Sequence, residues 1–280
     1  MHKKLLVPKY TAIRQIISIQ IRISLNVYAG KSKNLHMNLA HIHLHKVRNK
    51  GKISYATSVA FILSKLCNMR ATEVAEGIGE NLSTKLGGQF FVNVNPSGLI
   101  KILVSDQFIA NWLDSLISSS SENDLTIDSA GLAYYSPTLF TAQYCHARWC
   151  SLLRLGERER LIRPCRATQS SLWLDEDEKI RCDHQTTSCL ISELVQIVDW
   201  LYDDWESSQD IGKSNRKINW EKNIVGLVNT FTAFWADCRI LGTTISPELA
   251  QMRFNLIFAT KLVLEFLLLN HLGIAAPKSI

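Results

Sequence analysis

The sequence has no Cys-x-x-Cys pair among its seven cysteines, and it opens without a recognisable secretory signal. An odd number of widely spaced cysteines is typical of free thiols in a reducing compartment. We therefore expect a cytoplasmic protein with no disulfide framework and no metal site. Six prolines and thirteen glycines in 280 residues also argue against a long disordered region.

Long uninterrupted apolar runs are absent as well. The most apolar stretch covers residues 249–271, and Lys261 and Glu265 lie in its middle. Charged groups are costly at the centre of a bilayer, and the apolar pieces around them are shorter than the roughly 20 residues that span one. This stretch therefore predicts a buried helix rather than a membrane anchor.

Acidic residues are missing from the first quarter of the chain. Residues 1–72 hold thirteen Lys or Arg and no Asp or Glu, while the remainder is acidic and the whole chain carries +6. Such a start is typical of contact with nucleic acid or a membrane surface, of an organelle transit peptide, or of a basic tail without a specific role. Further on, residues 148–166 contain six arginines, which suit phosphates, and residues 175–210 contain eleven acids, which phosphates would repel.

Motifs that cradle nucleotide phosphates are also missing. The sequence contains no G-x-x-x-x-G-K-[ST] and no G-x-G-x-x-G, so we expect no ATP or dinucleotide cofactor. The run "HIHLHK" at 41–46 would place three histidines on one face of a strand. Three imidazoles could bind a metal; a polar strand face or a basic loop is the alternative.

Hydrophobic periodicity predicts helices with one β-hairpin. Residues 54–69 and 72–82 have apolar positions at helical spacing. The β-rich runs 89–94 and 99–104 are joined by "NPSG", whose residues favour a turn, so they predict a hairpin. Ser105 can cap a closing helix.

A Ser-rich segment then divides the chain, and the residues beyond it have a helical pattern. Helices are expected around 143–154, at 188–205, at 220–241 and from Ser246 to Gly273, each with an apolar stripe. The sequence thus predicts a mainly α protein, with a small N-terminal α+β module and a C-terminal all-α bundle. The expected parts are a basic segment (1–52), the module (53–118), a linker (119–136) and the bundle (137–280).

Three segments of the C-terminal half carry a family resemblance: "FTAQYCHARWCSLLR" (140–154), "FTAFWADCRILG" (231–242) and "LEFLLLNHLGIAAPKSI" (264–280). They resemble the DALR anticodon-binding domain of arginyl-tRNA synthetases. In that family the Tyr and Arg of the first segment lie close to the anticodon loop, which implies RNA contact for Tyr144 and Arg148. Trp235 and Ile280 are further candidates by the same resemblance, and Thr141 stands where the family has a second aromatic. The competing interpretation is that Tyr144 is a core residue and Arg148 an ordinary ion-pair partner.

The N-terminal half resembles the tRNA-binding module that begins the same enzymes, in "ISYATSVAFILSKL" (53–66) and "SGLIKILVS" (97–105). Leu99 stands where the family usually has Phe, and Lys101 where it has a polar amide; the resemblance places both on the D-loop side of tRNA. In the synthetases the catalytic domain lies between these modules, where this chain has only the Ser-rich segment.

The resemblance therefore implies a non-catalytic tRNA-binding protein without cofactor, acting on a tRNA of the arginine type. It could be an adaptor that presents tRNA to a modifying enzyme. Two alternatives stay open: the tRNA-binding subunit of a split arginine–tRNA ligase, which would need a separate catalytic chain and ATP, and a protein-interaction module that has lost RNA binding.

Overall fold

The computed structural model describes residues 12–29, 43–47, 51–118, 136–159, 172–182, 184–209, 218–240 and 245–279. They fall into two compact units, one from Ala12 to Ile109 and one that contains the chain from Ala110 onwards. The division lies inside a helix, α4, and the expected Ser-rich linker falls almost entirely outside the described residues.

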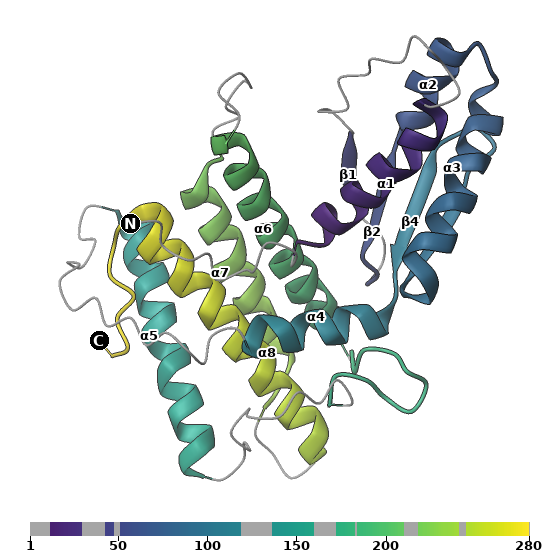
Figure 1. The fold of residues 1–280 in the computed structure, drawn as a ribbon. Helices are drawn as coiled ribbons and strands as arrows, with labels where there is room; N and C mark the ends of the chain where they lie inside the picture. The colour runs from purple at the N-terminus through teal and green to yellow at the C-terminus, as the bar shows by residue number, and fades with distance from the viewer. Residues whose placement is uncertain are drawn as a thin grey trace. The chain divides into compact units, whose positions relative to one another are not determined.

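The N-terminal unit is an antiparallel sheet with helices against one face (Figure 1). The strand order is β1-β2-β4-β3. Its elements are α1 (Ile13–Ala29), β1 (Leu44–Val47), β2 (Ser54–Thr57), α2 (Val59–Cys67), α3 (Ala71–Leu86), a short 3-10 turn (Gly87–Gln89), β3 (Phe90–Val94) and β4 (Ile100–Val104).

The expected hairpin is confirmed as β3 and β4. The turn closes where the Asn95 amide donates to the Leu99 carbonyl at 2.9 Å. Gly98 in this turn has a φ of +90°, and a Cβ there would meet the Ala71 backbone at 3.1 Å. Glycine is therefore required both by the backbone conformation and by the close approach of α3.

The core of this unit lies between the sheet and α3. Buried residues alternate along β4, and a Cβ on Gly79 of α3 would come within 2.9 Å of Val94 on β3, so helix and sheet are in tight contact. Helix α1 adds a fully buried stripe at a spacing of four residues. That stripe consists of Ile13, Ile17, Ile21 and Leu25.

Two details differ from the sequence interpretation. Residues 54–57 were expected to begin a helix, but they form β2, one of the two inner strands of the sheet, and α2 begins only at Val59. All four side chains of β2 are buried, and a strand covered on both faces does not show the polar alternation that marks a strand in a sequence. His43, just before β1, and His45 within it are exposed on either side of the buried Leu44, as expected of a polar strand face. His41 lies outside the described residues.

The C-terminal unit is a helical bundle (Figure 1). It contains α4 (Asp106–Ser118) from Ala110 onwards. Its other elements are α5 (Pro137–Arg158), α6 (Gln185–Gln209), α7 (Trp220–Asp237), α8 (Pro247–Phe266) and a π-helical end (Leu267–Leu272). The expected end signals of α8 are confirmed: the Ser246 hydroxyl accepts from the Leu249 amide at 3.2 Å, Pro247 is at the first turn, and Gly273 closes the helix with a φ of 66°.

Helix α8 is the centre of the bundle. It is buried on almost every side and contacts α5, α6 and α7. Lys261 and Glu265, the charges that interrupt its apolar run, pair with each other at 2.6 Å (Nζ to Oε2), one helical turn apart. The mainly α fold with a small α+β part, as expected from sequence, is therefore confirmed.

Outside the long helices, a turn at 172–182 is anchored to α4. The fully buried Trp173 donates from Nε1 to the Asp114 carboxylate at 2.6 Å. Burial raises the pKa of Asp114, and the hydrogen bond from Trp173 opposes that rise. The tip beyond it exposes Asp175, Glu176, Asp177 and Glu178. None of the helices that the structure describes is both long and apolar enough to cross a bilayer.

Candidate nucleic-acid interface

Helix α5 contains the segment that sequence analysis singled out, and its two sides differ sharply. Gln143, His146 and Trp149 are buried. Tyr144 is 48% exposed, and Arg148, one turn further along, is exposed as well. Since residues four apart share a helix face, the ring and the guanidinium stand together on the solvent side. The interpretation of Tyr144 as a core residue is thereby wrong.

The buried side of α5 holds the C-terminal segment of the chain, which runs beside this helix in Figure 1. Gln143 Nε2 donates to the Ala275 carbonyl at 2.8 Å, His146 Nδ1 lies 2.8 Å from the Pro277 carbonyl, and an Arg154 nitrogen donates to the Lys278 carbonyl at 3.0 Å. We call these three side chains and residues 274–279 the tail clamp. It fixes the back of the helix whose front carries Tyr144 and Arg148.

The protonation of His146 is set by its partner. A carbonyl can only accept, so Nδ1 must carry the proton and donate it to Pro277. Burial lowers the pKa of His146; the bond to Pro277 and the nearby Glu265 oppose that shift, whereas Lys261 and Lys278 reinforce it. A neutral, Nδ1-protonated imidazole is therefore part of the clamp.

Trp235 belongs to a cluster of three packed aromatic side chains that connects α5 and α7. Trp149 packs against Phe231 with ring centroids 4.1 Å apart, and Phe231 stacks on Trp235 at 6.5 Å with an interplanar angle of 13°. Trp235 is half-buried, so part of its ring is accessible.

Tyr144 and Trp235 are at different heights along the bundle. Ser136, just before α5, bonds to Glu221 at the start of α7, so the two helices run in parallel. Tyr144 comes five residues before the Trp149–Phe231 contact and Trp235 four residues after it, which separates them by about 13 Å along the helix axes. The two side chains therefore do not form a single contact point.

The other predicted site residues lie elsewhere. Leu99 and Lys101 follow each other on one face of the hairpin in the N-terminal unit; Lys101 is exposed and Leu99 half-buried. Ile280 lies outside the described residues. Of the arginines in 148–166, Arg148, Arg154 and Arg158 are described and exposed.

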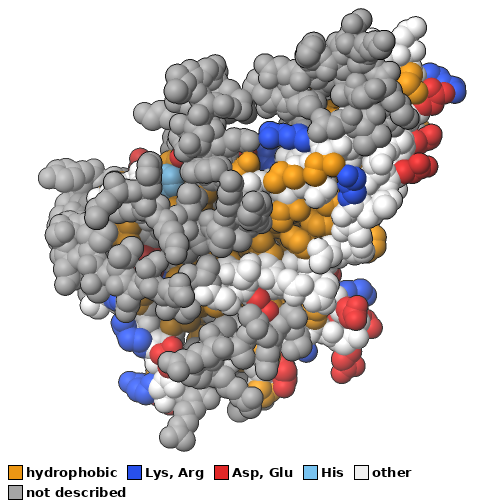
Figure 2. Space-filling view, in the orientation of Figure 1, with side chains coloured by type: hydrophobic (Ala, Val, Ile, Leu, Met, Phe, Trp, Pro, Cys, Tyr) orange, Lys and Arg blue, Asp and Glu red, His pale blue; other side chains and the backbone are white. Residues whose placement is uncertain are grey.

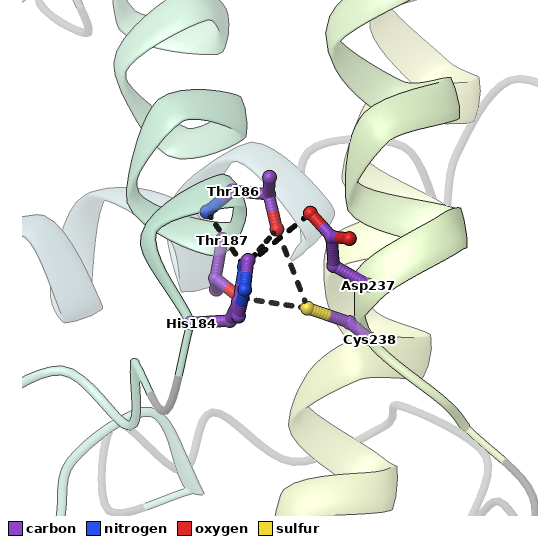
Figure 3. A network of polar contacts seen from close by, with 5 residues as sticks. All are labelled: His184, Thr186, Thr187, Asp237 and Cys238. Carbon is purple, nitrogen blue, oxygen red and sulfur yellow. Dashed lines mark hydrogen bonds and ion pairs between the residues drawn. The ribbon is translucent and has the colours of Figure 1, made fainter.

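A polar cluster joins the start of α6 to the end of α7 (Figure 3). His184 Nδ1 lies 2.8 Å from the Thr186 hydroxyl and 3.5 Å from Asp237. The sulfur of the buried Cys238 contacts the hydroxyls of Thr186 and Thr187 at 3.6 and 3.4 Å. A buried thiol bonded to hydroxyls is unsuited to nucleophilic attack, so we assign this cluster a structural role.

Sequence reasoning missed several members of the interface. The tail clamp was not foreseen, and neither was the exposure of Phe140, one turn before Tyr144. The signal for the clamp was present, because Gln143 and His146 are polar residues on an otherwise apolar helix face. Within the part of the chain that the structure describes, no three His, Cys, Asp or Glu side chains gather as metal ligands would.

Comparison with known proteins relates this chain to arginine–tRNA ligases. It is 28% identical to the enzyme of Synechococcus sp. (strain JA-3-3Ab) over 215 residues, which are 74% of this chain and 33% of that enzyme. It is 26% identical to the Moorella thermoacetica enzyme, in a match that covers 60% of this chain and 27% of that enzyme. It is 29% identical to the Methanocaldococcus jannaschii enzyme, in a match that covers 48% of this chain and 20% of that enzyme.

The chain thus spans a fifth to a third of the length of these relatives. No protein-family model matches it, and neither does any solved structure. The similarity supports a relationship to aminoacyl-tRNA synthetases at the family level and an arginyl-tRNA synthetase-like domain.

Proposed function

We propose that this chain is a tRNA-binding protein of the arginine tRNA type that does not itself catalyse aminoacylation. The observation that carries the proposal is the two-sided helix α5, with Tyr144 and Arg148 exposed on a helix whose back is fixed by the tail clamp. An exposed ring can stack an unpaired base, and a guanidinium can bond a phosphate or a base edge. Unpaired loops such as an anticodon offer both.

Charge and similarity support the same function. Arg154 and Arg158 are also exposed on α5, where Arg154 bonds to the tail and Arg158 pairs with Glu159. Affinity for a polyanion comes largely from contacts between such cations and phosphates. The arginine–tRNA ligases that resemble the chain act on tRNA by name. In our proposal Trp235 and Ile280 extend the anticodon side, and Leu99 and Lys101 meet the D-loop side.

The proposal excludes catalysis by this chain alone because of what lies between its two modules. In residues 119–136 the sequence is rich in Ser and acidic residues, and nowhere in the chain is there a glycine-rich phosphate motif. Without such a loop, the sequence offers no evident site for ATP. The chain would then act as an adaptor that hands tRNA to another enzyme.

Two assays on the purified full chain test the proposal. We expect binding of an arginine tRNA transcript, and no arginine-dependent exchange of pyrophosphate into ATP. Robust exchange by the chain alone would overturn the non-catalytic assignment. Exchange that appears only with a second, co-purified chain would favour the split-ligase alternative, and absence of tRNA binding would favour the protein-interaction alternative.

A further inference from the structure

The sheet of the N-terminal unit has a second face, away from α3, with an unusual set of exposed side chains. Phe91 and Asn93 on β3 stand directly opposite Leu103 and Lys101 on β4, so all four share this outer face. Phe91 is 56% exposed, the highest value among the large apolar side chains that the structure describes. Asn93 and Lys101 are exposed too.

The outer face continues across the sheet. Lys101 is opposite Ala56 on β2, and Ala56 is opposite His45 on β1. Ala56 is small and buried, whereas His45 is exposed. The part of this face on β2 is buried, so its accessible groups are the ring of Phe91, the amide of Asn93 and the ammonium of Lys101 on the hairpin, with the His45 imidazole on the far side of β2.

Most acidic side chains of this unit lie on its helices and none lies on the sheet. The four strands contain no Asp or Glu, and residues 12–109 hold twelve Lys or Arg against four acids. Three of those acids are on α3, where Glu76 and Glu80 are exposed while Gly79 packs on the sheet. In Figure 2 acidic side chains line the edge of the molecule over this helix. The outer face of the sheet is thus the side suited to a polyanion.

We propose that the outer face of this sheet binds an unpaired nucleotide of an RNA chain, with its base stacked on Phe91 and a neighbouring phosphate at Lys101. This inference rests on the proposed tRNA binding and adds a contact point to it. An exposed ring beside a cation is the combination that single-stranded nucleic acid requires, because stacking accepts any base and the cation holds the backbone. Asn93 and His45 can bond to base edges, which a duplex would keep paired.

The Phe91 site is distinct from Leu99. Phe91 pairs with Leu103 of β4, and Leu99 comes just before that strand. Leu103 and Leu99 are four residues apart, so the two sites are about 13 Å apart along the strand direction, with Lys101 between them. Leu99 cannot provide a ring, whereas Phe91 can. The sheet would then hold a stretch of RNA rather than a single base.

The test uses the full chain and two probes, an arginine tRNA transcript and the isolated anticodon stem–loop of the same tRNA. We expect Phe91→Ala to weaken tRNA binding about 5- to 150-fold, the range for loss of one stacked base, and to leave stem–loop binding unchanged. Phe91→Trp should restore tRNA binding and Phe91→Leu should not. Lys101→Ala should weaken tRNA binding and lower its salt dependence by about one phosphate contact.

The matched control is Leu66→Ala on α2, which removes a side chain that is 53% exposed from another surface of the same unit. It should leave both affinities unchanged. Thermal melting of each variant checks folding, and we expect little change in melting temperature because Phe91 is exposed. Should Phe91→Ala not fold, the tRNA affinity of Phe91→Leu is compared with that of the unaltered chain instead.

The outcomes separate the two proposals. If Tyr144→Ala weakens tRNA binding while Phe91→Ala binds like the unaltered chain, the Phe91 site is overturned and the tRNA-binding function stands. The outer face would then be a candidate surface for a protein partner instead. Full rescue by Phe91→Leu would overturn stacking in favour of a simple apolar contact. If the unaltered chain binds no tRNA, both proposals are overturned.

Discussion

Each of the two units has an exposed aromatic ring beside a cationic side chain, but the contacts that hold the two pairs in place differ in sequence separation. In the N-terminal unit, Phe91 and Lys101 are on neighbouring strands of one hairpin, and the contacts that hold them are only about ten residues apart in sequence. In the bundle, Tyr144 and Arg148 share one helix, but that helix is fixed by a tail more than 120 residues away. The first surface is built locally, and the second depends on a long-range contact.

The largest expected effect concerns the local unit. Removing residues 1–50 deletes α1, with four fully buried aliphatic side chains, and the edge strand β1. Loss of each such side chain costs about 2–5 kcal/mol, so the sum approaches or exceeds a typical total stability of about 5–15 kcal/mol. We expect this unit to unfold, with circular dichroism losing its sheet contribution.

The matched control is removal of residues 1–11 only, which leaves α1 intact. It should melt within a few degrees of the full chain. Equal melting curves for the two truncations would show that α1 is not part of the core.

The second prediction concerns the long-range contact in the bundle. Removing residues 274–280 deletes three hydrogen bonds of the tail clamp and leaves the buried His146 donor without its acceptor. At roughly 1 kcal/mol per bond, with an extra cost for the buried donor, the free energy of unfolding should fall by about 3–5 kcal/mol. Denaturant titration measures this. Removing only Ser279 and Ile280, beyond the last clamp bond, should cost less than about 0.5 kcal/mol; a large cost there would contradict the clamp.

A smaller effect is expected from pH. Burial lowers the pKa of His146 and also of His271, where Asp204 opposes the shift. The unfolded chain takes up protons below about pH 6.5 and the folded chain does not, so stability should fall as pH decreases through that value. Melting at pH 7.5 and 5.5 measures the loss. The double variant His146→Gln, His271→Gln should lose less; an identical loss would show that other groups are responsible.

The smallest predicted effect concerns salt. If the basic N-terminus and the arginines of α5 neutralise phosphates, tRNA affinity should fall with salt, with a log–log slope of about −0.7 to −0.9 per contact. Residues 1–11 contain Lys3, Lys4 and Lys9, and their removal should flatten the slope by up to three contacts. An unchanged slope would assign this segment no role in RNA binding.

The local and long-range regions also differ in how well sequence predicted them. The hairpin, the caps of α8 and the four long helices of the bundle are indicated by residues close together in the sequence, and all of them were predicted. Helix α1 was not, because Ile17, Ile19, Ile21 and Ile23 alternate as in a strand while Ile13, Ile17 and Ile21 repeat as in a helix. Only burial decides between those two periods.

The candidate site shows the same limit. The resemblance pointed to Tyr144 and Arg148, but whether they were core or surface depended on which side of α5 meets the tail. A contact such as Gln143 to Ala275 has no local signature, and neither does the outer-face position of Phe91, which is set by the register of β3 on β4.

Parallel melting and tRNA titration of Tyr144→Ala, Arg148→Ala and Arg148→Lys test the central claim most directly. We expect each alanine variant to lose about 1–3 kcal/mol of binding free energy, and Arg148→Lys to restore it only in part, because an ammonium cannot replace a planar guanidinium. The free energy of unfolding should change by less than about 0.5 kcal/mol, since both side chains are exposed. Lys179→Ala, an exposed cation paired with Asp177 in the acidic turn, serves as control and should bind normally. Unchanged tRNA affinity in the folded Tyr144 and Arg148 variants would contradict the account and reduce α5 to a packing helix.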